Sequence, residues 1–144
     1  YHLFGEDEKV LALKEARRVT KTGGIIFVAY CMNDYAILTY GFKEKHIKES
    51  VENGRITENF HVVSEEKDLY DYVRLEDIDA VNARVSVERI KIITPDGPAN
   101  HIRPVLNKLD EEEFALFLQY HLTVCERGDM MGAAAHTLDI LRAV

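Results

Sequence analysis

The side chains of this sequence best suited to bind a metal or move a proton are six histidines and two cysteines. The histidines are His2, His46, His61, His101, His121 and His136. His121 and Cys125 stand four residues apart in a predicted helix, so they could share one face as metal ligands do. A zinc site needs two further ligands, and no neighbouring spacing supplies them. We therefore predict no metal site and interpret His121 as a core or supporting histidine.

Sequence motifs for cofactor binding or nucleophilic catalysis are absent. There is no G-x-G-x-x-G, no phosphate-binding loop and no G-x-S-x-G. Gly23 and Gly24 precede a predicted strand instead of opening a helix, so we interpret them as a helix stop. Cys31 and Cys125 have no C-x-x-C spacing and are predicted to be buried, reduced thiols.

The overall charge is acidic, with a formal net charge of −7 over 144 residues and a sequence pI near 5.4. Nucleic acids and anionic membranes are bound by clustered Lys and Arg, so neither is expected as a partner. No apolar run has the length of a transmembrane helix, and no signal peptide opens the chain. These features predict a cytoplasmic protein.

The elements that position these residues begin with a helix over residues 6–21. Acidic residues stand at its start and basic residues at its end, as the helix dipole favours, and Val10, Leu13, Ala16 and Val19 form one apolar stripe. A continuous apolar run over residues 25–30 follows, which is typical of a strand covered on both faces. A helix, a glycine turn and a buried strand together make half of a βαβ unit.

The middle of the chain is less regular. Residues 33–53 have a helical pattern interrupted at Gly41, residues 55–73 have no clear period, and residues 75–84 predict a short helix with Ile78 and Val81 inward. We interpret residues 33–84 as a helical insertion that forms a lid over a site.

The last third of the chain predicts two strands and a helix. Residues 87–93 alternate in polarity like a half-exposed strand, and residues 95–98 have the composition of a turn. Asp110 and Glu113 form a capping box for a helix over about 111–126, and residues 136–141 predict a final strand. The apolar residues of that helix are expected to be buried: Phe114, Phe117, Leu118, Leu122 and Cys125.

One family ties these segments together. Tyr1-His2-Leu3, the charged helix ending at Gly23-Gly24 and the strand from Ile25 to Tyr30 resemble the second half of an S-adenosylmethionine-dependent methyltransferase of the Rossmann-like type. The later segments resemble the C-terminal part of bacterial members that carry a helical insertion. Those segments are Asp96-Gly97, Asn100-His101, Arg103, Tyr120-His121-Leu122, Cys125-Glu126-Arg127 and His136-Thr137-Leu138.

The resemblance implies an α/β fold that holds strands five, seven and six of the family's sheet, with the last strand antiparallel between the other two. Ligands of such sheets bind outside the carboxyl ends of the strands. The resemblance then places Tyr1 and His2 beside the S-adenosylmethionine cofactor. It places a small-molecule substrate near the residues that follow strands five and six, which are Tyr30, Asn33, Tyr35, Asp96 and His101. If a general base assists the transfer, His2 and His101 are the candidates.

The sequence also departs from the family, because the glycine-rich first loop and the acidic residue that binds the ribose are absent. The sequence begins with a run that is largely apolar and has no Met, which predicts that residues 1–144 form a single incomplete domain. Such a piece is expected to be inactive by itself. The unpaired edge of the first strand predicts that this piece forms a homodimer. The alternative from another class is a free-standing α/β domain that binds a partner or dimerises without catalysis.

Overall fold

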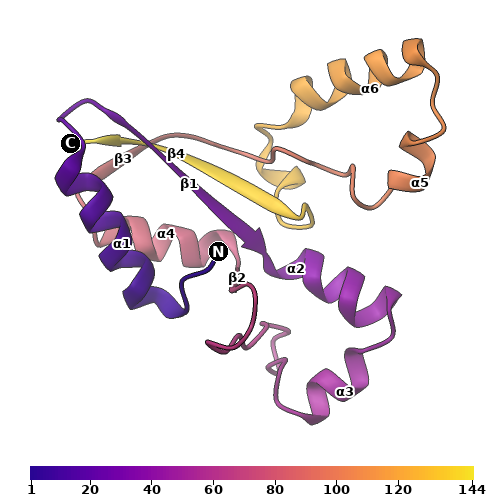
Figure 1. Cartoon of the computed structure of the whole chain (residues 1–144), viewed down its shortest axis with the longest axis horizontal. Helices are drawn as coiled ribbons and strands as arrows, with labels where there is room; N and C mark the ends of the chain where they lie inside the picture. Colours follow the sequence, from indigo (N-terminus) through magenta and orange to yellow (C-terminus); the bar gives the residue numbers. More distant parts are fainter.

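The computed structural model describes residues 1–144, and it shows an α/β fold with one mixed sheet of four strands (Figure 1). The first helix, α1 (Gly5–Val19), matches the predicted helix closely. It ends before Gly23, which adopts a positive φ of 84°. A side chain disfavours that conformation, so glycine suits the turn into β1 (Ile25–Met32). The helix-turn-strand unit predicted from the sequence is confirmed.

The sheet has the strand order β2-β1-β4-β3. Its remaining strands are β2 (Tyr72–Val73), β3 (Val87–Ile93) and β4 (His136–Ala143). β4 lies antiparallel to both β1 and β3, so these two neighbours run parallel to each other. β2 pairs in parallel with β1 only at Cys31 and Met32, which leaves the rest of that edge of β1 without a neighbouring strand.

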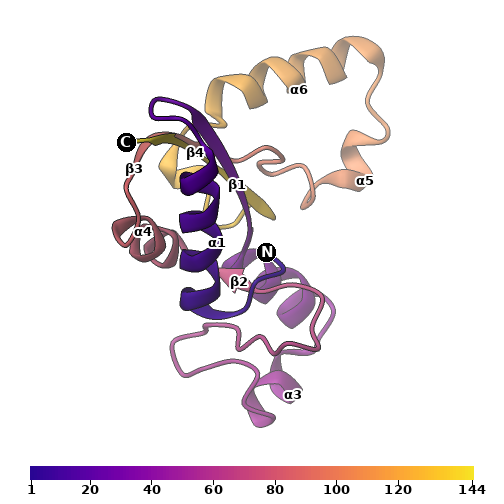
Figure 2. The same cartoon turned by 60° about the vertical axis from the view of Figure 1, so that its left-hand side comes forward.

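The core lies on one face of the sheet, under α1 and α4 (Leu75–Ala83) (Figure 2). Val10, Leu13 and Val81 from these helices pack against Ile26 and Leu141 of the sheet. Ile78 and Val81 are buried, as predicted. α4 stands at the end of the stretch we interpreted as an insertion, and the structure places it in this core.

A buried charge network crosses the same face. Asp139 of β4 is fully buried, and its carboxylate accepts two hydrogen bonds from Arg89, at 2.7 Å from Nε and 2.9 Å from Nη2. Asn82 of α4 donates a third hydrogen bond at 2.7 Å. The hydrogen bonds that Arg89 donates to Asp139 raise the pKa of Arg89, so its guanidinium stays charged. The network ties α4 to the two strands.

The other face of the sheet is bare, and the prediction that β1 is covered on both faces was wrong. Ile26 is 8% exposed, whereas its neighbour Phe27 is 64% exposed. Successive side chains of a strand point to opposite faces, so one face of β1 is covered and the other is open. α1 and α4 share the covered face, and the remaining helices lie beyond the ends of the strands (Figure 1).

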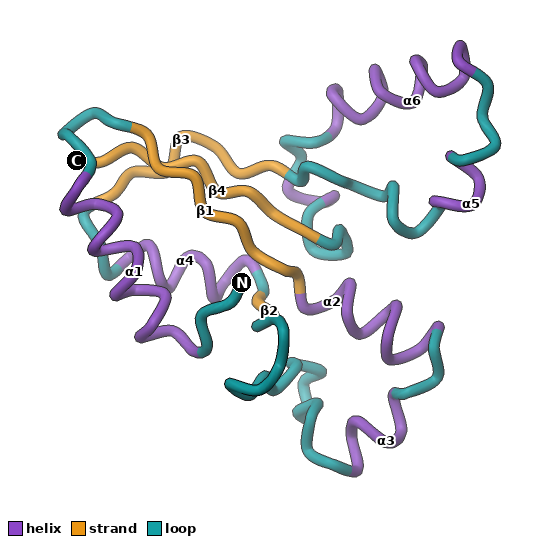
Figure 3. The backbone as a smooth tube through the Cα atoms, in the orientation of Figure 1, coloured by secondary structure: helices purple, strands orange, loops and turns teal.

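Two arms extend from the carboxyl ends of the parallel strands (Figure 3). The first follows β1. It contains α2 (Asn33–Ala36), a π-helical segment η1 (Ile37–Lys43), α3 (Ile47–Glu52) and a long loop that leads to β2. The predicted helix break near Gly41 falls after Lys43, because Gly41 lies buried inside η1. The irregular stretch predicted over residues 55–73 is a loop closed by one bridge between Ile56 and Val62.

The second arm follows β3 and contains α5 (Arg103–Leu106), α6 (Glu111–Val124) and the short helix η2 (Gly128–Met130). The capping box of Asp110 and Glu113 is confirmed, since each side chain accepts from the other's backbone N–H. The predicted burial along α6 was wrong. None of its residues is buried, because α6 stands away from the sheet with no element packed on it (Figure 1). Leu122 is 74% exposed.

Candidate functional site

The carboxyl ends of β1 and β3 lie at one edge of the sheet, where β4 begins. β1 ends at Met32, β3 ends at Ile93, and β4 starts at His136. Side chains that follow these ends come from distant parts of the sequence and meet there. Ligands of open α/β sheets bind at this edge, so it is the candidate site.

His136 and Asp96 form a hydrogen-bonded pair at this edge. The His136 Nδ1 lies 2.8 Å from Asp96 Oδ2, and the His136 backbone N–H donates to Oδ1 at 3.3 Å. Asn100 Nδ2 also donates to Oδ2, at 2.9 Å, and the Thr94 hydroxyl donates to Oδ1 at 3.3 Å. Four contacts therefore fix the carboxylate, and the carboxylate fixes the imidazole.

The orientation of His136 determines its chemistry. Because a carboxylate accepts hydrogen bonds, the contact with Asp96 favours the proton on Nδ1, and in a neutral ring this leaves Nε2 as the nitrogen that can accept a proton. The His136 side chain is 46% exposed, while that of Asp96 is 19% exposed. The His136 ring is therefore accessible to a ligand, while Asp96 is mostly buried behind it. A general base requires this arrangement.

A group of aromatic rings, Tyr1, His2 and Tyr70, lies next to this pair on the side of Tyr1. The Tyr1 ring lies 6.5 Å from His136 and 5.7 Å from Tyr70, between ring centroids. The His2 ring lies 4.9 Å from Tyr1 and 5.5 Å from Tyr70. The Tyr1 amino group also lies 3.5 Å from the Ala29 carbonyl oxygen, which places this residue along the open edge of β1. Tyr1 and His2 therefore lie close to the strand ends, and their predicted contact with a cofactor stays a prediction.

His101 and Tyr35 meet at the same edge, but His101 is committed to another contact. Its Nε2 lies 2.7 Å from the Ala133 carbonyl oxygen, and its ring stands edge-to-face against Tyr35 at 5.1 Å. The carbonyl accepts a hydrogen bond from Nε2, so that nitrogen is not free to take a proton from a ligand. Of the two histidines predicted as bases, only His2 keeps both ring nitrogens outside the chain's hydrogen bonds.

Two residues predicted to contact substrate instead support the structure. Tyr30 is 3% exposed and packs with Met32, Val73 and Ile78 on the covered face of the sheet. Burial raises its pKa to about 12, so its hydroxyl stays protonated. The Tyr30 ring points into the core on the covered face of the sheet and away from the strand-end cavity, so a ligand in that cavity does not reach it.

Asn33 is fully buried and joins the first arm to the loop behind it. Its Nδ2 donates to the Phe60 carbonyl at 2.9 Å, and its Oδ1 accepts from the Val62 backbone N–H at 2.7 Å. These bonds satisfy both ends of the amide, so Asn33 has a structural role. Sequence reasoning placed it at the site because it directly follows β1.

Two neighbouring cavities lie at this edge. The first encloses about 300 Å³ between the strand ends and the first arm, and its lining includes Cys31, Tyr35, Asn100 and His136. The second encloses about 360 Å³ within the first arm. The two share one wall, made of Ala36, Tyr40, Tyr70 and Tyr72. Both volumes lie at the lower end of the range typical for small-molecule sites.

Other classes of site are not built by these residues. No group of three or more His, Cys, Asp or Glu side chains is placed to hold a metal ion, and His121 and Cys125 gain no partner ligands. Both cysteines are free thiols, with Cys31 buried and Cys125 partly exposed. None of the helices combines the length and hydropathy that crossing a bilayer requires.

Comparison with models of known protein families found no match, and comparison with curated proteins found none either. The function is therefore inferred from the geometry at the strand ends.

Proposed function

We propose that this chain is the acceptor-side, C-terminal part of an S-adenosylmethionine-dependent methyltransferase acting on a small molecule. The observation that carries the proposal is the oriented His136–Asp96 pair at the carboxyl ends of parallel strands, beside a cavity of about 300 Å³. The strand order supports it, because β4 lies antiparallel between β1 and β3. The final strand of that family has the same place between strands five and six.

The methyl donor is not fitted by these 144 residues alone. β1 continues directly into α2, and only Arg74 separates β2 from α4, so no strand leads through a glycine-rich turn into a helix. The nucleotide part of S-adenosylmethionine therefore requires residues from elsewhere in the protein. Tyr1 and His2, beside the open edge of β1, are the residues of this chain that would face it.

The chain's own contribution is to position the acceptor and hold its proton. S-adenosylmethionine, held by other residues of the protein, would supply the electrophilic methyl group and leave as S-adenosylhomocysteine. An acceptor in the strand-end cavity brings its hydroxyl or amine to His136 Nε2, which accepts the proton as the nucleophile forms its new bond. Asp96 stabilises the resulting imidazolium through Nδ1. Most of the rate enhancement then comes from proximity, with the base adding to it.

The structure favours His136 over the two histidines predicted from the sequence. His101 uses its Nε2 on a backbone carbonyl, and His2 lies tilted against Tyr1 and Tyr70 without a carboxylate to orient it. His136 combines an orienting carboxylate with an available nitrogen. The sequence separates His136 from Asp96 by 40 residues, so no local pattern joins them.

Calorimetric titration with S-adenosylhomocysteine tests the proposal. We expect binding by a protein extended upstream of Tyr1 and none by residues 1–144 alone, since the nucleotide site is incomplete here. Absence of binding by both proteins would overturn the proposal. That result would favour the alternative, a non-catalytic binding or dimerisation domain, to which the bare face around Phe27 is suited.

The role of His136 is tested in the same extended protein. His136→Gln is expected to lower kcat by about 10²–10⁴-fold and to remove the acidic limb of the pH–rate profile. Asp96→Asn should lower kcat less and shift that limb. His61→Gln serves as the matched control for loss of a histidine, because His61 contacts Asp77 of α4 and not the strand ends. An unchanged pH profile in the His136 variant would exclude it as the base.

A further inference from the structure

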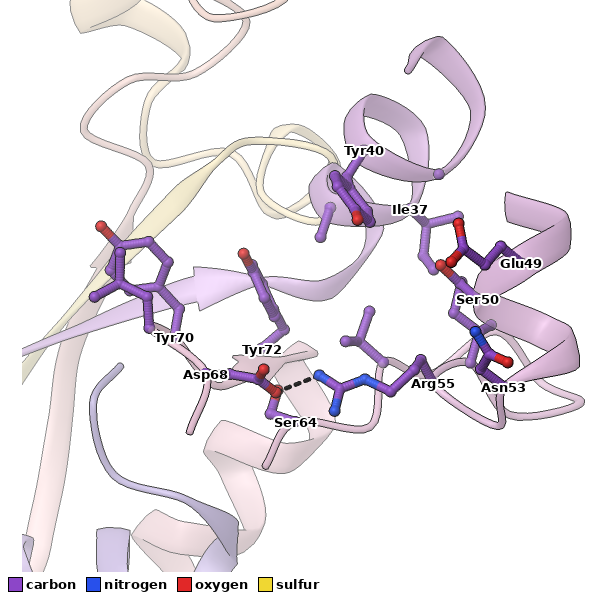
Figure 4. Close-up of a pocket in the computed structure, with 15 residues that line it drawn as sticks. Ile37, Tyr40, Glu49, Ser50, Asn53, Arg55, Ser64, Asp68, Tyr70 and Tyr72 are labelled. Atoms are coloured by element: carbon purple, nitrogen blue, oxygen red, sulfur yellow. Dashed lines mark hydrogen bonds and ion pairs between the residues drawn. The ribbon is translucent and has the colours of Figure 1, made fainter. Parts of the chain in front are cut away.

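The cavity inside the first arm is separate from the strand-end cavity and has its own chemistry (Figure 4). It encloses about 360 Å³ between η1, α3 and the loop that leads to β2. Tyr70 and Tyr72 lie at one end of it, and Glu49, Ser50 and Asn53 lie at the other (Figure 4). Buried apolar residues, Ile37 and Ile56, complete the lining. The space therefore suits a small, partly apolar molecule.

The charges around this cavity disfavour an anion. Arg55 is its one cationic residue, and the guanidinium is already bound by Asp68 and, at 3.0 Å, by Glu65. The hydrogen bond that Arg55 donates to Asp68 raises the pKa of Arg55, so the guanidinium stays charged and paired. An anionic ligand would have to displace one of these carboxylates.

The remaining charges favour a cation. The Glu65 backbone N–H and Arg55 hold the pKa of Asp68 below its usual range, so it is ionised. Both of these contacts go to Oδ2, which leaves Oδ1 outside them. The Glu49 carboxylate has one titratable neighbour, His46, whose Nδ1 lies 3.9 Å from Glu49 Oε2. The lining therefore contains two carboxylates, Glu49 and Asp68, and its only cationic residue, Arg55, is already paired.

Three tyrosine rings add to this preference. Tyr40, Tyr70 and Tyr72 line the cavity, and the face of an aromatic ring attracts an organic ammonium ion. His46 stacks on one face of Tyr40, with centroids 4.3 Å apart at 14°, and so holds that ring in place. We propose that this cavity binds a small organic ammonium ion, with its apolar groups against Ile37 and Ile56.

The ammonium site suggests which acceptor the proposed methyltransferase would use, and its role in catalysis rests on that proposed function. Tyr40, Tyr70 and Tyr72 also line the strand-end cavity, so an ammonium group held against these rings would lie next to the space that His136 borders. The acceptor class that follows is a small amine with a second group, a hydroxyl or an amine, that reacts near His136.

Titration of the 144-residue chain with choline, followed by NMR, tests the site directly. The matched control ligand is dimethylbutanol, in which carbon replaces the choline nitrogen and the charge is lost. We expect choline to bind about tenfold more tightly, since the two ligands share a shape and differ in charge. Equal affinity for the two ligands, or no binding of choline, would overturn the inference.

Substitutions locate the binding. Tyr40→Leu is expected to weaken choline binding several-fold, and Tyr40→Phe to retain it, because phenylalanine keeps the aromatic face. Tyr40 is 54% exposed, so neither change threatens the core. Tyr120→Leu, on α6 and 49% exposed, is the control outside the cavity. Equal effects of Tyr40→Leu and Tyr120→Leu would place the choline elsewhere.

The two proposals fail in different ways. Choline binding does not depend on the methyl donor, so it can be present when the extended protein binds no S-adenosylhomocysteine. That outcome would leave an ammonium-binding site without a methyltransferase. The reverse outcome would leave a methyltransferase whose acceptor is not an amine.

Discussion

The helices α1 and α6 have similar sequence patterns but different surroundings. Each begins with acidic residues and carries apolar residues at helical spacing. In α1, Val10 and Leu13 are 2% and 4% exposed, because the helix packs on the sheet and on α4. In α6 no residue is buried, and Leu122 is 74% exposed. Helical periodicity therefore identifies the side of a helix that can be buried, and the chain's topology decides whether a partner is there.

A large effect should come from the charge network in the core. Asp139→Asn removes the carboxylate that accepts two hydrogen bonds from Arg89, while the ion pair of Arg89 with Asp79 remains, so the free energy of unfolding is expected to fall by about 2–3 kcal/mol. The counterpart in the second arm is the exposed pair of Arg127 and Asp129, 2.7 Å apart. Asp129→Asn should change stability by less than about 1 kcal/mol. Urea unfolding of both variants measures the difference, and similar losses would contradict the contrast.

A pair of leucine truncations isolates packing from charge. Leu141 is fully buried, so Leu141→Ala is expected to cost about 2–5 kcal/mol of unfolding free energy through lost contacts and a cavity. Leu122→Ala removes the same atoms from an exposed position and should cost less than about 0.5 kcal/mol. A large loss from Leu122→Ala would show that α6 is packed against a partner in solution.

The bare face of β1 should control self-association, which the sequence predicts as a homodimer. Phe27 projects from a strand whose edge, from Ile25 to Tyr30, lacks a neighbouring strand, and such edges promote pairing. Phe27→Glu is expected to weaken the dimer at least about tenfold by light scattering, since association would bury a charge. Leu122→Glu, on the second arm, is the comparison. A monomeric parent chain at high concentration would refute the dimer.

The smallest expected effect concerns the contact between the first arm and the core. His61 Nε2 lies 2.9 Å from Asp77 Oδ2 at the start of α4. Burial lowers the pKa of His61, but the hydrogen bonds to Asp77 and to the Val62 carbonyl outweigh it, so the pKa lies above its usual value. When the folded-state pKa of a histidine is raised, its contribution to stability is fully present below the unfolded-state pKa of about 6.5. That contribution is lost as the pH rises through the folded-state pKa.

Stability should therefore fall by less than about 1 kcal/mol as pH rises above about 6.5, to the extent that His61 loses its proton. His61→Gln should flatten that slope in thermal unfolding measured at several pH values. His46→Gln is the control, because His46 only approaches Glu49 at 3.9 Å. The same slope in the His61 variant and in the parent chain would exclude this pair as its cause.

The candidate site was only partly predictable. Tyr1, His2, Tyr35 and Asp96 lie near the strand ends in the structure, and their roles in binding a ligand stay predictions. His136 was not recognised, since its partner Asp96 is distant in sequence and the two meet only through the pairing of β4 with β3. Tyr30 and Asn33 were assigned to a ligand because they stand near the end of β1, yet the strand's alternation and a buried amide network turn them inward.

Local patterns in the sequence by themselves determined several elements and their approximate limits: the apolar period of α1, the Gly23-Gly24 stop, the strand β1 and the capping box at Asp110. Each of these depends on residues within a few positions of one another. Only the tertiary structure decided which surfaces are covered, which cavities form and which histidine faces a carboxylate. Those properties depend on contacts between residues far apart in sequence, and short-range spacing does not encode them.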